Sequence, residues 1–400
     1  MNLVGMRSLA RITVAAAAAL QLAAFPGTAL AVDAKVHGLL DVVLAGKTEA
    51  IEYNTLWMGD TRFDAYAARI FVDGVVTDRI QVHTQLLAEE VIGVRAMGAY
   101  AMIDPWLDRD IHVVAGLMPY LVGTMDTRSY SDKNPLIGLP LVYQHHTSLH
   151  WDQVPATTDE LLSQAGLEYR GSSFGAGYPY PGMAVVYLHW WDFGVGVIGS
   201  ARPFEFALGI ENGMPSWPDP TRDSNNGKGL QGRIGIAPSP ALRFGVSGAY
   251  GPYLSDNLAT PLAPGQTTED YNQVLGMVDA EWSAGHFELR GEGYHNTWQT
   301  PTVGDLSVAG FYAEGKWTLP AGFYLAGRYE IMRFTDVKDS SGVSKPWDTD
   351  WDRGEAGVGY RLARGVLLKT VYQWNTPKSD SPNLDGETDD LVAAQLSVRF

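Results

Sequence analysis

The feature that most constrains this chain is an alternation of apolar and polar residues, which recurs in runs of roughly ten residues. In the last run, Leu391 to Phe400, the even positions are apolar, whereas the odd positions include Gln395, Ser397 and Arg399. A period of two places successive side chains on opposite faces of a β-strand. The sequence therefore predicts an all-β fold whose strands each have one apolar and one polar face.

Sixteen such runs can be counted along the chain. They cover residues 35–45, 62–73, 78–87, 94–104, 110–118, 188–200, 203–212, 230–237, 241–251, 271–282, 286–296, 307–318, 323–335, 351–362, 366–375 and 390–400. An even number of antiparallel strands returns both ends of a closed barrel to the same side of a membrane. The count predicts a transmembrane antiparallel β-barrel of about sixteen strands.

Tight turns and longer polar connections alternate between these runs. The tight turns include Asp73-Gly74, Asp104-Pro105, Ala284-Gly285 and Arg364-Gly365. The longer connections include residues 213–229, 252–270, 336–350 and 376–389. Short periplasmic turns opposite longer extracellular loops are typical of outer-membrane barrels.

One connection, from about residue 119 to 182, is far longer than an ordinary loop. It contains the apolar stretch Leu136 to Tyr143, and Thr157 to Glu160 form a capping box that starts a short helix. Such a segment is expected to fold against a surface rather than stay disordered. The nearest surface in a wide barrel is the lumen wall, so we expect this third extracellular loop to fold inward and narrow the pore.

A soluble β-sandwich shows the same alternation, but the positions of the aromatic residues on the apolar strand faces distinguish it from a membrane barrel. Those beside the tight turns are Phe204, Phe244, Trp282, Phe287, Trp317, Phe323, Tyr360 and Phe400, and those near the opposite strand ends are Tyr250, Tyr372 and Trp374. Two aromatic girdles around a lipid-facing band favour the membrane barrel.

The first 31 residues are expected to be a secretory signal. Arg7 and Arg11 precede the apolar stretch 12–24, and Ala29-Leu30-Ala31 fits a cleavage site. Residues 32–400 then form one barrel domain. Removing two arginines and no acids changes the formal net charge from −16 to −18, which argues against a nucleic-acid partner. The absence of cysteine excludes a disulfide framework.

Several charged residues have inward parity or lie in the long loop. The candidates for the pore wall are Arg290, Glu314, Lys316, Arg328, Glu330 and Lys369, and those for the constriction are Asp126, Arg128, Asp132 and Lys133. Such residues suit a water-filled lumen. The alternatives are wall groups that are merely hydrated and salt bridges internal to the loop.

Other chemistry finds little support in the sequence. His145, His146 and His150 match no closed metal-site spacing, and we expect them to be solvated or to line the pore. No Ser, His and Asp grouping suggests a hydrolase, so neither an enzyme nor a cofactor is expected. Acids in the last two long loops suit divalent cations that bridge to lipopolysaccharide, although charge for solubility is the simpler interpretation.

Three features carry a resemblance to known proteins. They are the terminal strand with its final Phe400, the early hairpin Arg69 to Arg79, and Tyr130-Ser-Asp-Lys-Asn-Pro135 in the long loop. With them the chain resembles bacterial porins, namely the phosphate-selective porin-like group and, more broadly, the sixteen-stranded general porins. The resemblance implies a homotrimeric channel in the bacterial outer membrane, in contact with lipid and lipopolysaccharide. It also implies that Phe400 is recognised by the barrel-assembly machinery.

Phosphate selectivity is not carried over, because the long loop offers mainly Arg128 and Lys133 beside several acids. The expected function is passive diffusion of small hydrophilic solutes or ions through a water-filled barrel. The alternative is an outer-membrane barrel without transport activity, such as an adhesion or envelope-anchoring protein, and a barrel hydrolase ranks third.

Overall fold

The computed structural model describes residues 33–47, 65–89, 93–166, 169–171, 179–188, 190–219, 223–378, 383 and 390–400. The expected signal segment, residues 1–31, lies outside the described residues. Among the described residues, no helix is both long and apolar enough to cross a bilayer.

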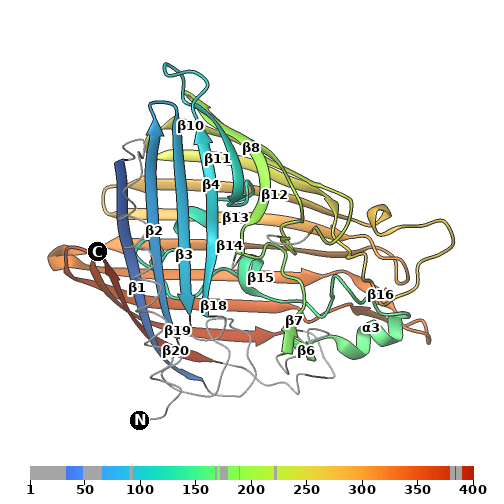
Figure 1. The fold of residues 1–400 in the computed structure, drawn as a ribbon. Helices are drawn as coiled ribbons and strands as arrows, with labels where there is room; N and C mark the ends of the chain where they lie inside the picture. Colours follow the sequence, from blue (N-terminus) through green and yellow to red (C-terminus); the bar gives the residue numbers. More distant parts are fainter. Residues whose placement is uncertain are drawn as a thin grey trace, which may run out of the picture.

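Sixteen strands form one closed antiparallel barrel (Figure 1). They are β1 (Asp33–Lys47), β2 (Ala65–Thr77), β3 (Ile80–Glu89), β4 (Gly93–Ile103), β5 (Ile111–Met118), β8 (Asp192–Ala201), β9 (Phe204–Glu211), β10 (Gly229–Ser239), β11 (Leu242–Pro252), β12 (Asn272–Ala284), β13 (Phe287–Trp298), β14 (Leu306–Thr318), β15 (Phe323–Phe334), β18 (Trp351–Ala363), β19 (Val366–Pro377) and β20 (Leu391–Arg399). Each strand pairs with its neighbour in sequence, and β20 pairs with β1 to close the sheet. The predicted closed antiparallel barrel and its sixteen predicted strands are confirmed.

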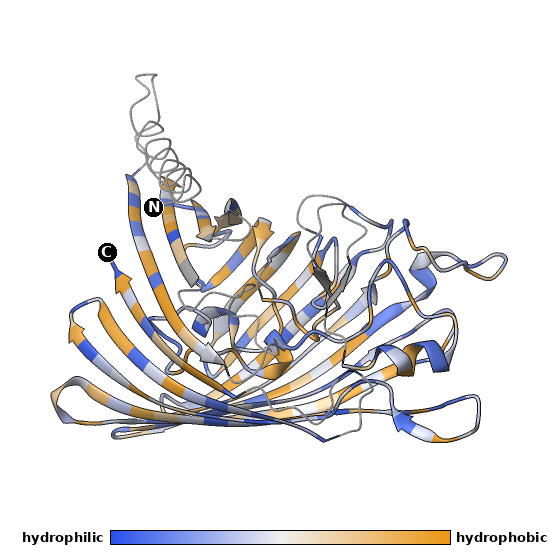
Figure 2. Cartoon of the chain, turned by 90° about the horizontal axis from the view of Figure 1, so that it is seen from below, coloured by the Kyte–Doolittle hydropathy of each residue, from blue (hydrophilic) through white to orange (hydrophobic). Residues whose placement is uncertain are grey.

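The two faces of the wall differ as the alternation predicts. On β12, Val274 and Val278 are exposed on the outside, whereas Leu275 and Asp279 are buried on the inside. Directly paired residues share a face, so Val278 stands opposite Val246 on β11. The strands in Figure 2 accordingly show alternating hydrophobic and hydrophilic bands. A register slip of one residue would turn the charged positions toward the outside.

One predicted turn is wrong. Asp73-Gly74 is not a turn, because β2 continues to Thr77 and the chain reverses at Asp78 and Arg79. Gly74 pairs with Ala34 on one side and Val82 on the other, so both neighbouring strands hold it in the sheet. At the true tight turns after β12 and β18, Gly285 and Gly365 have φ of 58° and 80°, which side-chain-bearing residues rarely adopt.

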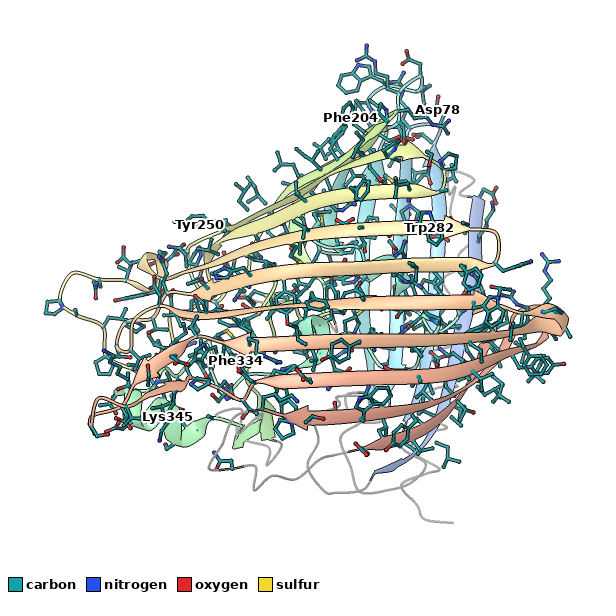
Figure 3. The ribbon with its side chains drawn as sticks, turned by 180° about the vertical axis from the view of Figure 1, so that it is seen from behind. Asp78, Phe204, Tyr250, Trp282, Phe334 and Lys345 are labelled. Atoms are coloured by element: carbon teal, nitrogen blue, oxygen red, sulfur yellow. The ribbon has the colours of Figure 1, made fainter. Side chains whose placement is uncertain are left out.

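The outward aromatic residues lie near the strand ends. Phe204 and Trp282 lie toward the short-turn end of the barrel, and Tyr250 lies at the opposite end, which carries the longer loops (Figure 3). Some rings from neighbouring strands stack, with centroids 4.3 Å apart for Phe323 and Tyr360. These positions agree with the predicted girdles.

The chain end closes the barrel against β1. The Phe400 amide donates to the Gly38 carbonyl at 3.0 Å, and the Gly38 amide donates to the Phe400 carbonyl at 2.8 Å. The Phe400 ring lies so close over Gly38 that a Cβ at position 38 would collide with it. Glycine at this position therefore permits the terminal ring to pack on the first strand.

The remaining elements belong to the connections. Between β5 and β8 lie η1 (Asp126–Arg128), α2 (Leu141–Gln144), α3 (Thr158–Gln164), β6 (Tyr169–Gly171) and β7 (Pro179–Pro181), and elsewhere lie η2 (Thr268–Asp270), η3 (Pro320–Gly322), β16 (Asp336–Lys338) and β17 (Ser344–Pro346). The predicted helix start is confirmed, since the Thr157 hydroxyl accepts from the Glu160 amide at 3.2 Å. α3, the β6–β7 pair and β16 gather at the long-loop end (Figure 1).

Candidate pore-lining site

The long connection between β5 and β8, residues 119–191, is hydrogen-bonded to side chains on the inner face of the barrel wall. We call it the β5–β8 segment. On one side the Leu121 amide donates to Gln231 of β10 at 2.9 Å, and the Gly123 amide donates to Ser247 of β11 at 3.0 Å. Further along the wall, Glu292 of β13 accepts from the Thr124 amide at 2.6 Å, the Thr124 hydroxyl at 2.7 Å and the Tyr143 hydroxyl.

The same segment also contacts strands on either side of the barrel closure. The Tyr130 hydroxyl donates to Gln85 of β3 at 2.8 Å. The Ser131 hydroxyl bonds Asp41 of β1 and, at 2.7 Å, Ser397 of β20. The segment is therefore tied to walls that lie far apart around the barrel.

Lys369 of β19 is a buried anchor for the segment. Its ammonium donates to the carbonyls of Ser131, Asn134 and Leu136 at 2.9, 3.1 and 2.9 Å. These three bonds use all the donors that an ammonium has. Lys369 thus fixes the backbone of residues 131–136 rather than facing open water.

Arg328 of β15 is a second buried anchor, at the centre of a charged cluster. Its guanidinium bonds Glu314 at 3.2 Å, Glu330 at 2.8 Å and Glu355 at 2.7 Å, and it also donates to the Gly138 carbonyl at 2.9 Å. The Leu141 amide donates to Glu330 at 2.5 Å, and the amides of residues 137 and 138 donate to Glu355. The segment's own backbone thus compensates the surplus of carboxylates around one guanidinium.

The six predicted wall residues all lie on the inner face, but only some of them meet a cavity. Arg290 and Lys316 line cavities at the short-turn end, and Glu314 lies behind them, paired with Arg290 at 2.6 Å. Arg328, Glu330 and Lys369 are instead buried, and each is hydrogen-bonded to the backbone of the β5–β8 segment. Strand parity identifies the inner face but does not reveal what packs against it.

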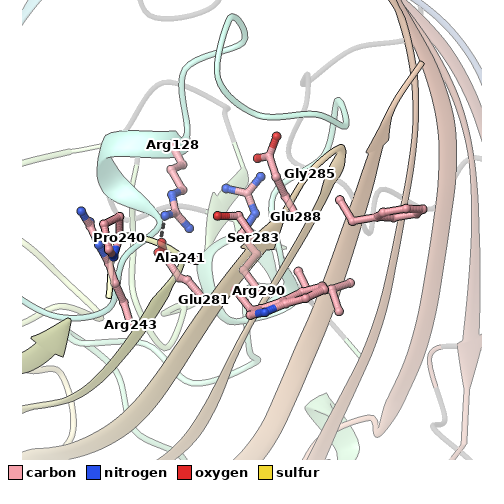
Figure 4. Close-up of a pocket in the computed structure, with 12 residues that line it drawn as sticks. Arg128, Pro240, Ala241, Arg243, Glu281, Ser283, Gly285, Glu288 and Arg290 are labelled. Carbon is pink, nitrogen blue, oxygen red and sulfur yellow. Dashed lines mark ion pairs between the residues drawn. The ribbon is translucent and has the colours of Figure 1, made fainter. Parts of the chain in front are cut away.

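The four predicted constriction residues are dispersed and take part in different interactions. Arg128 forms an ion pair with Glu281 of β12 (Figure 4), and Asp132 forms one with Arg399 at 2.8 Å. The Lys133 ammonium lies over the Tyr130 ring, 5.6 Å from its centroid. Asp126 accepts from the Trp191 indole at 3.0 Å, and desolvation raises the pKa of its carboxyl to about 6.

Two cavities lie at the short-turn end of the lumen. The first, of about 370 Å³, is lined by Arg128, Arg243, Arg290 and the acids Glu281 and Glu288 (Figure 4). The second, of about 110 Å³, is lined by Lys133, Lys316, Arg361 and the acid Asp132. The ion pair of Glu288 with Lys316, at 2.8 Å, joins the two linings. We call the six cations Arg128, Lys133, Arg243, Arg290, Lys316 and Arg361 the basic belt.

The basic belt was only partly evident in the sequence. Inward parity and the long loop identify most of its members, but nothing in the sequence shows that they gather at one end. The pairing of Arg128 with Glu281 joins residues far apart in the chain. The β11 to β18 strands supply Arg243, Arg290, Lys316 and Arg361 near their short turns, so the clustering follows from the shared direction of those turns.

The three histidines of the segment contradict the expectation that they are solvated or line the pore. His145, His146 and His150 are buried. His145 lies against Phe334 and Trp351, and the Nδ1 atom of His146 is 2.6 Å from the Gly182 carbonyl. Burial lowers the pKa of His145 and of His146 to about 4. Within the described ranges, no group of three or more His, Cys, Asp or Glu side chains could hold a metal ion.

Apolar packing dominates the long-loop half of the segment. Leu141, Leu149, Trp151 and Leu161 of the segment pack into one buried cluster with wall and loop side chains. The large partners in that cluster are Trp298, Phe334, Trp347 and Trp351. The segment therefore has an apolar attachment near the long loops and polar anchors nearer the middle of the wall.

No protein-family model and no curated protein matches this chain. Solved structures do match. The loop L8 deletion mutant of OmpT, an outer membrane protein of Vibrio cholerae, is 11% identical with a TM-score of 0.57, covering 92% of this chain and 100% of that one. The anion-selective porin from Comamonas acidovorans is 10% identical, with a TM-score of 0.56 and coverage of 92% and 100%.

Salmonella typhi OmpF, in complex with daunomycin, is 12% identical with a TM-score of 0.55, covering 92% of this chain and 97% of that one. Identities this low establish a likeness of fold alone. The closed sixteen-stranded barrel and these structural relatives together show that this chain has the fold of a general porin-like outer-membrane β-barrel.

Proposed function

We propose that this protein is a porin, which lets small hydrophilic solutes or ions diffuse passively through a water-filled barrel. The observation that carries the proposal is a closed barrel whose inner face bears charged side chains and whose longest connection is hydrogen-bonded to that face. Closure leaves no unpaired strand edge, and the apolar outer face suits lipid. Charged groups on the inner face require water or partners, which a solute pathway supplies.

The β5–β8 segment is proposed to narrow this pathway. Its anchors on β1, β3 and β20 and those on β10 to β13 support a course across the lumen. The cavities at the short-turn end support an aqueous vestibule on the side that would face the periplasm. A solute would then leave the narrow part of the lumen beside the basic belt.

The test is conductance in planar lipid bilayers. Purified, folded protein should give discrete current steps, and replacing residues 126–164 by a short Gly-Ser linker should increase the step size several-fold. The matched control is an equally short linker in place of residues 339–343, which connect β16 and β17 away from the wall anchors. Folded full-length protein and linker variant that both fail to conduct would contradict the porin proposal.

A second candidate is a barrel without transport activity, such as an adhesion or envelope-anchoring protein. The apolar cluster of the segment with Trp298, Trp347 and Trp351 favours it, because tight aromatic packing leaves no room for water. The same experiment separates the two functions. A full-length protein that never conducts, beside a linker variant that does, would identify the segment as a plug.

The location that we propose is the bacterial outer membrane, with the outer face in contact with lipid and lipopolysaccharide. Exposed aliphatic side chains between two sets of aromatic rings support this location. Phe400, whose ring packs on Gly38 at the closing strand, is proposed as the signal recognised by the barrel-assembly machinery. We further propose a homotrimer, in line with the neighbour OmpT, which was described in a trimer form.

A further inference from the structure

The basic belt contains more cations than the acids beside it can neutralise. Its two cavities are lined by six basic and three acidic side chains. Each of those acids already has a cation: Glu281 pairs with Arg128, Glu288 with Lys316, and Asp132 with Arg399 outside the belt. Each acid is therefore already neutralised by an ion pair, and part of the positive charge of the basic belt has no acidic partner.

The surplus can be assigned to particular residues. Within the part of the chain that the structure describes, no acidic side chain forms an ion pair with Arg243, Arg361 or Lys133. All three are exposed to the cavities that they line. Arg290 differs, because it is paired with Glu314 at 2.6 Å.

The sign of this surplus is opposite to that of the whole chain, whose formal net charge is −16. Unpaired guanidinium and ammonium groups on a low-dielectric wall concentrate counter-ions near them. Planar guanidinium groups also hold carboxylates and phosphates through two parallel hydrogen bonds. A cluster of such groups at one end of a lumen is therefore suited to small anions.

We propose that the basic belt is a binding station for small anions of the carboxylate or phosphate type, and that Arg243, Arg361 and Lys133 give the pore its preference for anions. This inference rests on the proposed porin function, because a preference has meaning only for a conducting barrel. The station lies at the short-turn end, where the two cavities adjoin. The paired members Arg128, Arg290 and Lys316 hold the acids that would otherwise repel the anion.

The first experiment measures the reversal potential across a bilayer under a KCl gradient. The wild type should prefer chloride over potassium, and Arg243→Gln with Arg361→Gln should lower the permeability ratio several-fold. Lys345→Gln with Lys338→Gln is the matched control, since it removes two cations from the β16–β17 hairpin and should leave the ratio unchanged. The preference should also fade near 1 M salt, where the screening length is about 3 Å.

The second experiment does not depend on conduction. At constant ionic strength, inorganic phosphate should raise the melting temperature of the wild type and of the control pair, but not that of the Arg243→Gln, Arg361→Gln variant. Conduction with an unchanged permeability ratio would overturn the inference while leaving the porin proposal intact. A protein that does not conduct contradicts the porin proposal, and the absence of phosphate stabilisation then overturns the binding station as well.

Discussion

At the scale of single residues, Lys369 shows how the donors of a buried ammonium can be satisfied. Its three hydrogen bonds to carbonyls replace the water that an ammonium loses. Lys369→Met keeps the side-chain length but leaves three carbonyls without a donor. We expect the free energy of unfolding to fall by about 3 kcal/mol, measured by urea titration in lipid vesicles.

The matched control for that substitution is Lys316→Met, which removes an exposed ion pair with Glu288. Exposed pairs contribute about 1 kcal/mol or less, so the control should remain close to the wild type. Equal losses for the two variants would mean that Lys369 does not anchor the segment.

Charge reversal at Arg128 and Lys133 belongs to the same scale. Arg128→Glu would place a carboxylate against Glu281, and Lys133→Glu would remove a free cation from the second cavity. We expect the reversal potential of the double variant to shift toward cations. Lys338→Glu with Lys345→Glu, on the β16–β17 hairpin, is the control with the same charge change. A potential that moves equally in both pairs would exclude a local role for Arg128 and Lys133.

At the level of residues, the sequence predicted correctly on which face of the barrel wall a side chain lies. It did not predict which side chains are buried by other parts of the chain. The alternation along each strand assigned Arg328 and Lys369 to the inner face, because the face of a strand residue follows from its neighbours two positions away. Their burial depends on segment residues that lie far away in the sequence, such as Gly138 and Ser131. His145 was misjudged for the same reason, since its partners Phe334 and Trp351 come from distant strands.

At the scale of elements, the β5–β8 segment should loosen in acid. The folded pKa of His145 and His146, about 4, lies below the unfolded value of about 6.5. Between these values the unfolded state binds more protons, so the stability present above pH 6.5 is lost as the pH falls toward 4. Each histidine contributes roughly 3 kcal/mol at most.

Limited proteolysis of the segment, compared at pH 7.5 and pH 4.5, measures this effect. His145→Gln with His146→Gln should abolish most of the pH dependence, whereas the exposed His286→Gln should retain it. Asp126 acts in the opposite sense, because its raised pKa makes stability fall as the pH rises through about 6. Comparing variants at each pH removes that contribution. Identical cleavage of the wild type and the double histidine variant would contradict the prediction.

Elements were the best-predicted level of this structure. Period-two alternation is a local signal, so all sixteen strands were identified. For most strands the predicted ends differ from the observed ends by a few residues. The Asp73-Gly74 error arose because a good turn dipeptide was outweighed by pairing with two neighbouring strands. The path of the β5–β8 segment was beyond such reasoning, because its anchors are scattered over strands from β1 to β20.

At the scale of the whole molecule, the outer face of the barrel is not uniform. Aromatic rings are exposed on strands from β8 to β19, whereas the exposed large side chains of β1, β3 and β4 are aliphatic, among them Leu40, Val82 and Val94. Among the described side chains, the exposed rings at this arc are Phe400, which packs on Gly38 of β1, and Trp106, in the turn beyond β4. Interfacial rings mark where a wall meets lipid head groups. An arc whose strands carry exposed aliphatic side chains, with rings only at its short-turn edge, suits burial against another copy, which supports the proposed homotrimer.

Substitutions on the two kinds of surface test this arrangement. Val82→Lys with Val94→Lys places charges on the aliphatic arc, and Val246→Lys with Val278→Lys places the same charges on β11 and β12, where all four valines are exposed. Both pairs expose two lysines to lipid at a similar energetic cost. A difference in oligomeric state between the two variants therefore shows which surface lies in the interface between copies. Light scattering in detergent should give a mass of three copies for the wild type and the β11–β12 pair, and a mass of one copy for the arc pair. A wild-type mass of one copy would refute the homotrimer, and three copies for the arc pair would move the interface to another part of the wall.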